Sequence, residues 1–418
     1  MNHSFAFQNS EITFEIPDTA RVFQSAPDSK IGDVYTSVIK HLLRPLGYRQ
    51  SLFDLAKTCK TACVVVDALC PPDFIDQMIG PIVKTLHAAG MNHNDILFLA
   101  ASEYPAIFAK DTVAKMLEER YKGYDVQIHQ MSSPENHVFI GNSKQGVPIY
   151  LDARLQKTDL KIIAGGIHSH SLFGFSGASL LMPFGLANLE TISALFEVVG
   201  TDCMEDFRLV NTGSKLFNEL DSIFELAQLD FIFNIFPDRG MNVTDIFSGK
   251  PHHVLKSMML KLNKPAEELP APADVVITSP GCARCNDSWN FFLQSLGIAA
   301  SYVKKNGALV FITSLFDEMS EEQLVDLKNM NGLTKLLSGG TFIQNDKDPY
   351  HCYIGESIVL FISPNIRISK QIFDKRRALY FFSSIDQAMS FLQENVKKSS
   401  DVLILPQALY TNPRPSIL

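Results

Sequence analysis

The chain has 418 residues, of which 46% are hydrophobic and 20% are charged, and its formal net charge is −8 at pH 7. This length predicts two domains that form their own cores without disulfide staples. The negative charge, and the lack of a long basic block, argue against binding to nucleic acid or to an anionic membrane. Seven cysteines, an odd number without an apolar leader, predict reduced thiols and a cytoplasmic protein.

The first part of the chain alternates between short apolar runs and segments with helical periodicity. Strands are predicted at residues 63–67, 95–100, 126–129, 138–140, 146–150, 160–164 and 231–236. Helices are predicted at residues 74–87, 113–120, 189–199 and 216–226. The segment at 146–150 is expected to return on 138–140 as a hairpin.

A proline-rich segment at residues 263–273 is the clearest predicted linker. Beyond it, strands are predicted at 275–278, 308–313, 358–362 and 402–405, and helices at 288–304, 320–330 and 384–396. We therefore predict an α/β fold with two domains, residues 1–262 and 274–418. Both domains are expected to contain mostly parallel sheets, with an interdomain cleft between them.

The most informative segment directly follows the predicted strand at 160–164. It reads Gly165-Gly166-Ile167-His168-Ser169-His170, and Phe175-Ser176-Gly177 comes shortly after it. Two imidazoles and a turn rich in Gly and Ser thus lie where a strand ends and a helix is expected to begin. Ligands of open α/β sheets bind beyond the carboxyl ends of strands, and the N–H groups of such a turn favour an anion.

Residues 166–185, with Glu190-Thr191-Ile192 after them, resemble the signature block of the nickel-dependent lactate racemase family. In that family the block contains a Pro-His pair, then G-F-S-G-G, a lysine, and later E-T-I-x-x-N-H. Further segments that resemble the family follow in the same order, at residues 65–67, 96–105, 141–149 and 278–281. The resemblance covers nearly the whole chain and implies the fold of that family.

The resemblance also implies a chemistry, namely hydride transfer on a 2-hydroxy acid by a nickel-pincer nucleotide that is tethered to a lysine. One catalytic histidine of the family falls on His170, but the second falls on Glu103. The tether position falls on Leu180 and the metal-ligand position on Phe196. Where the family has Arg, Gln and Lys, this chain has Cys70, Phe291 and Gln294. These departures predict that the nickel-pincer cofactor is not retained.

Three functions remain open at this point. In the first, the chain is a divergent racemase, epimerase or lyase that acts on a small 2-hydroxy or related carboxylic acid. His170 and Glu103 would then be the acid/base pair on opposite faces of an acidic C–H group. The residues predicted to bind the substrate are His168, Ser176, Gly177 and Asp67.

In the second, the chain is a catalytically inactive paralogue that binds a small ligand or a protein partner, as a homo-oligomer or paired with another family member. In the third, lactate racemase-type activity survives with a nickel cofactor held non-covalently. An open pocket between His170 and Glu103 would favour the first function, and packing of Leu180, Phe196 and Phe291 against one another would favour the second. The C-x-x-C pair Cys282 and Cys285 is interpreted as buried thiols, with a metal or redox role as the alternative.

Overall fold

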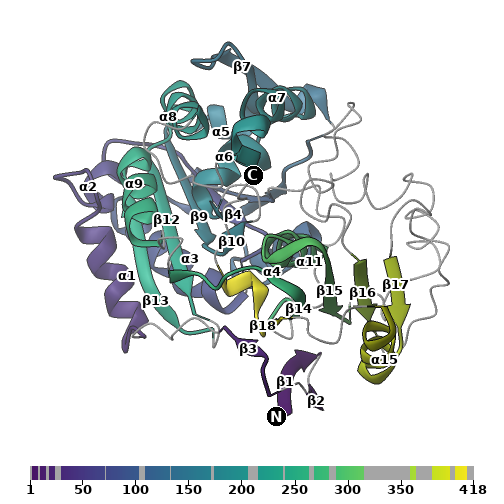
Figure 1. Ribbon diagram of the computed structural model, residues 1–418. Coiled ribbons are helices and arrows are strands. Elements are labelled where there is room, and N and C mark those ends of the chain that lie inside the picture. Colours follow the sequence, from purple (N-terminus) through teal and green to yellow (C-terminus); the bar gives the residue numbers. More distant parts are fainter. Residues whose placement is uncertain are drawn as a thin grey trace.

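Two six-stranded sheets form the framework of the protein (Figure 1). The structure is a computed structural model that describes residues 2–7, 10–15, 18–23, 30–70, 72–102, 109–131, 133–170, 174–205, 215–238, 241–262, 268–281, 289–314, 358–363, 379–395 and 401–411. Among these residues, no helix is both long enough and apolar enough to cross a membrane.

The first sheet has the strand order β13-β12-β9-β4-β5-β6. Its strands are β4 (Ala62–Asp67), β5 (Ile96–Ala101), β6 (Asp125–Ile128), β9 (Leu160–Gly166), β12 (Phe231–Pro237) and β13 (Val243–Gly249). All neighbours are parallel except β13, which runs antiparallel to β12. The central strands β4 and β9 are buried along their whole length, as expected for a parallel sheet covered on both faces.

Helices cover both faces of this sheet, and the side chains of β4 alternate between them. Val64 and Val66 belong to one apolar core with α1 (Val34–Leu43), α2 (Leu52–Ala56), α3 (Pro72–Ala88) and α4 (Ala109–Arg120). Cys63 and Val65 belong to the other core, with α6 (Ala178–Gly185), α7 (Leu189–Glu205), α8 (Lys215–Ala227) and α9 (Pro251–Leu262). The two-residue period of an extended strand therefore divides the core into two layers.

The second sheet has the order β17-β16-β15-β14-β18-β3, and all its strands are parallel. They are β3 (Arg21–Val22), β14 (Ala273–Thr278), β15 (Val303–Ile312), β16 (Ile358–Ile362), β17 (Leu379–Phe382) and β18 (Val402–Leu405), with helices α11 (Trp289–Ala300) and α15 (Ile385–Asn395). The edge strand β3 comes from near the N-terminus, and Arg21 forms an ion pair with Asp401. The predicted domain limits, residues 1–262 and 274–418, remain a prediction. The strand β3 belongs to the first of these ranges by sequence but pairs in the second sheet.

Among the described residues, three antiparallel strand pairs lie outside the two large sheets. They are β1 (Asn2–Phe7) with β2 (Ser10–Glu15), β7 (His137–Asn142) with β8 (Pro148–Asp152), and β10 (Ser169–His170) with β11 (Gly174–Phe175). The short helix α5 (Ala153–Gln156) follows β8 directly. The β10–β11 pair, which we call the His ribbon, carries the histidine-rich segment.

The predicted fold class, α/β with mostly parallel sheets, is confirmed. The predicted helix at 288–304 is wrong at its C-terminal end, because α11 ends at Ala300 and β15 begins at Val303. Val303 pairs there with Ala273 of β14, so sheet pairing takes over from helical periodicity. The predicted helix at 320–330 lies outside the described residues.

Candidate functional site

Both histidines of the predicted site lie just beyond the carboxyl end of β9. The chain leaves β9 at Gly166, and the N–H of Ile167 still donates to the carbonyl of Ile235 in β12. His168 follows, and His170 then pairs with Gly174 in the His ribbon. The side chains of both histidines are buried, with exposed fractions of 8% and 1%.

Two glycines, Gly165 and Gly177, allow close packing of the backbone around the end of β9. A Cβ atom on Gly165 would lie 3.1 Å from the backbone nitrogen of Ala178 and 3.2 Å from the carboxyl of Asp67. Gly177, which precedes α6, has φ = 118°, a conformation that residues with a Cβ rarely adopt. The strand end, Asp67 and the start of α6 can therefore approach one another closely.

Both the backbone and the side chain of Ser176 form hydrogen bonds with His168. The N–H of Ser176 donates to the carbonyl of His168 at 2.9 Å. Its Oγ lies 2.7 Å from Nδ1 of His168 and accepts a long bond, 3.4 Å, from the backbone N–H of that residue. These contacts orient the imidazole of His168 within the turn.

The second part of the chain reaches the same two histidines through α11, which packs against β10. The side-chain amide Nε2 of Gln294 lies 3.3 Å from Nε2 of His170, and an amide N–H can only donate. The ring of Phe291 meets the imidazole of His168 edge-on, with 5.2 Å between the ring centroids. Thus two residues that the resemblance aligned with the family's Gln and Lys do lie at the histidines.

Burial controls the protonation of the site. It lowers the pKa of His168 to about 4, with a smaller opposing effect from the backbone of Gly166. Burial, and then the neighbouring His168, hold the pKa of His170 well below its ordinary 6.5. Burial raises the pKa of Asp67 to about 7, against the backbone N–H groups of Leu69 and Gly166 that favour its charged form. At neutral pH both imidazoles are therefore uncharged, and Asp67 is partly protonated.

The structure brings most of the predicted site residues together. His168, His170, Ser176 and Gly177 belong to one turn, and Asp67 lies against Gly165 at the end of the adjacent strand. The roles predicted for these residues remain predictions. The N–H of Ser176 is already used within the turn, which leaves less of its backbone for a ligand. Glu103, Cys282, Cys285 and the side chain of Phe196 lie outside the described residues.

The residues at this site do not fit a lysine-tethered pincer cofactor. At the position that the resemblance assigns to the lysine, Leu180 is buried with an exposed fraction of 2% in the apolar core of the first sheet. A hydrocarbon side chain cannot form an amide-type bond to a cofactor. Within the described residues, no group of three or more His, Cys, Asp or Glu side chains is arranged to hold a metal ion.

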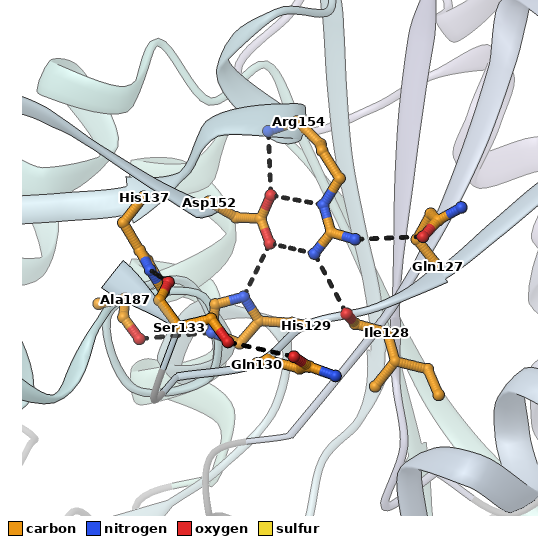
Figure 2. A network of polar contacts seen from close by, with 9 residues as sticks. All are labelled: Gln127, Ile128, His129, Gln130, Ser133, His137, Asp152, Arg154 and Ala187. Carbon is orange, nitrogen blue, oxygen red and sulfur yellow. Dashed lines mark hydrogen bonds and ion pairs between the residues drawn. The ribbon is translucent and has the colours of Figure 1, made fainter. Parts of the chain in front are cut away.

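His129, Asp152 and Arg154 form a second buried polar cluster, which no sequence motif predicted (Figure 2). Nδ1 of His129 lies 2.9 Å from Asp152, and Arg154 donates to both carboxylate oxygens through Nε at 2.9 Å and a terminal nitrogen at 2.6 Å. His129 and Asp152 have no exposed surface. This network joins β6, the edge strand of the first sheet, to the β7–β8 hairpin, so we interpret it as structural.

Comparison with known proteins agrees with this fold. Residues 7–203 match the model of the family described as the lactate racemase N-terminal domain. A lactate racemase from Thermoanaerobacterium thermosaccharolyticum is 23% identical over 326 residues, which cover 75% of this chain and 74% of the relative.

Solved structures give the same result. The structure of the lactate racemase apoprotein from that organism superimposes with a TM-score of 0.73 at 17% identity, and covers 98% of this chain and 99% of its own. A protein from Thermotoga maritima superimposes with a TM-score of 0.59 at 15% identity, and the match covers 90% of this chain and 96% of that protein.

The fold and the site thus define an α/β protein with two parallel sheets and a pair of buried histidines at a strand end. Residues 7–203 are similar to the lactate racemase N-terminal domain family, and the chain shares the fold of the lactate racemase apoprotein.

Proposed function

We propose that the chain binds a small 2-hydroxy or related carboxylic acid at His168 and His170, and racemises, epimerises or eliminates it by acid–base chemistry without a tethered cofactor. The observation that carries this proposal is the pair of buried, uncharged imidazoles between the end of β9 and α11. A buried imidazole that is free of charge can accept a proton in a site that excludes water.

His170 is the proposed base. Its Nε2 accepts the amide N–H of Gln294, so this nitrogen carries a lone pair that points toward α11. A ligand that replaces the amide would place its Cα–H bond at the same lone pair. His170 then removes the proton, and the electron pair of the broken C–H bond moves into the ligand carboxyl group as an enediolate.

Two outcomes follow from such an enediolate. Return of a proton to the opposite face of Cα, with Glu103 as the proposed donor, gives racemisation or epimerisation. Loss of a hydroxide from the neighbouring carbon gives elimination instead. Both reactions balance without an added oxidant or reductant, which suits a site with the buried Leu180 at the position that the resemblance assigns to the tethering lysine.

A catalytically inactive paralogue that binds a small ligand or a protein partner is the second candidate. The burial of Leu180, and the contact of Phe291 with His168, favour it, because apolar side chains here replace the polar groups of the family. Each fully buried apolar side chain contributes about 1.5–3 kcal/mol to stability. Such replacements therefore suit a site that no longer catalyses a reaction.

Isotope exchange distinguishes the two candidates. The purified chain is incubated in D₂O with a panel of small 2-hydroxy acids, and loss of the Cα proton signal is followed by NMR. We expect exchange with at least one member of the panel. Saturable binding without exchange would support the inactive paralogue, and the absence of both would contradict the proposed ligand class.

A further inference from the structure

His168 has one side-chain nitrogen without a hydrogen-bond partner among the described residues. This atom is Nε2, and it is inaccessible to solvent in a residue that is 8% exposed. A buried polar atom without a partner costs about 1–3 kcal/mol, and native proteins rarely leave one in place without a reason. A ligand that enters the site can satisfy this nitrogen.

The contacts of Ser176 indicate which nitrogen of His168 carries the proton. The Ser176 hydroxyl oxygen accepts the backbone N–H of His168, so its own proton is available for donation. Two acceptors are within reach, Nδ1 of His168 at 2.7 Å and the carbonyl oxygen of His168 at 3.4 Å. That carbonyl already accepts the N–H of Ser176 at 2.9 Å. If the shorter contact receives the serine proton, Nδ1 is the bare nitrogen and the ring proton lies on Nε2.

We infer that Ser176 holds His168 with its proton on Nε2, and that this N–H donates to an oxygen of the bound ligand, a carboxylate or the enediolate derived from it. His168 is then an electrophilic donor and not a second base. The inference rests on the proposed function for the chemical class of the ligand, but the position of the proton is independent of turnover.

The surroundings of His168 suit this role. Burial lowers its pKa to about 4, so the imidazole remains neutral and keeps a single N–H through the physiological range. A neutral imidazole donor does not give up its proton readily, and it stabilises negative charge on an oxygen during reaction. The edge-on ring of Phe291 covers the imidazole and limits water, which strengthens the hydrogen bond.

NMR of ¹⁵N-histidine-labelled protein at pH 7 tests the inference. The signals of His168 are assigned by their loss in the His168→Gln variant. We expect a protonated Nε2 and a bare Nδ1, and we expect added oxalate, a small planar dicarboxylate, to shift the Nε2–H signal. A proton on Nδ1, or an Nε2 signal that oxalate does not change, would overturn the inference.

Variants separate the donor role from simple packing. His168→Gln keeps a side-chain N–H and should bind oxalate nearly as well as the natural chain, whereas His168→Leu should bind it at least about tenfold more weakly. Ser176→Ala should mix the two tautomers, while Ser179→Ala, a buried serine in α6, should leave them unchanged. Equal oxalate affinity of the Gln and Leu variants would overturn the donor role.

These readouts do not depend on catalysis. A chain that shows the Nε2–H tautomer and an oxalate-dependent shift, yet exchanges no Cα proton, fails the proposed reaction but supports this inference. If the chain exchanges the Cα proton of the ligand but carries the His168 proton on Nδ1, the proposed reaction is supported and this inference is overturned.

Discussion

Replacing His170 with Gln is expected to lower the rate of Cα-proton exchange by about 10²–10⁴-fold, the usual contribution of a general base. Glutamine fills a similar space and can still pair with Gln294, but it has no nitrogen lone pair that could accept a proton. The exchange rate of the best 2-hydroxy acid in D₂O is the measurement. Because His170 is 1% exposed, the variant should also be checked for an unchanged circular dichroism spectrum.

The matched control is His253→Gln, which changes an exposed histidine at the start of α9. Its exchange rate should equal that of the natural chain. If His170→Gln exchanged the Cα proton as fast as this control, His170 could not be the base, and the proposed mechanism would have to be abandoned.

Replacing Asp152 with Asn is expected to destabilise the first sheet by about 3 kcal/mol, the low end of the range for breaking a buried ion pair. The low end applies because the side chain of Arg154 is 27% exposed and water compensates part of its charge. Asparagine keeps the shape of Asp152 but leaves Arg154 and His129 without their carboxylate. Urea denaturation followed by circular dichroism measures the loss.

The same ion pair predicts a dependence on pH. Burial acts to raise the pKa of Asp152, but the bonds from Arg154 and His129 outweigh it and hold the pKa below its ordinary 3.8. A carboxyl whose pKa is lower in the folded state stabilises the fold above its unfolded pKa, and this stabilisation disappears as the pH falls below 3.8. Asp152→Asn should flatten the acid side of the stability curve.

Asp125→Asn is the control, because Asp125 is exposed on the neighbouring strand β6. It should change the free energy of unfolding by less than about 0.5 kcal/mol. Equal stability of the Asp152 and Asp125 variants would show that the His129 network does not hold the β7–β8 hairpin to the sheet.

The central strands could be predicted because their sequences carry the signal locally. β4 is an apolar run that ends in Asp67, and β9 is apolar apart from Lys161, which is close to what a strand buried on both faces requires. The short edge strand β3 has only two residues, and its position depends on pairing with β18 almost 400 residues later in the chain. No local pattern could have placed it in the second sheet.

The candidate site was predictable to a similar extent. Because His168 and His170 follow a buried strand, they were predicted to lie at the carboxyl ends of the strands of the sheet. The pairing of Gln294 with His170 joins residues that are far apart in the sequence and depends on how the two parts of the chain pack. His129 lay at the end of a predicted strand, but only the folded β7–β8 hairpin brings Asp152 to it.

The central claim is that this fold works here without the tethered nickel cofactor, and the mass of the intact chain under denaturing conditions tests it most directly. The protein should be purified from cells supplied with nickel, and peptides that contain Leu180 and the lysines should be analysed in parallel. We expect the mass of the unmodified polypeptide. A higher mass, with a nickel-pincer group attached covalently to any lysine, would contradict the account.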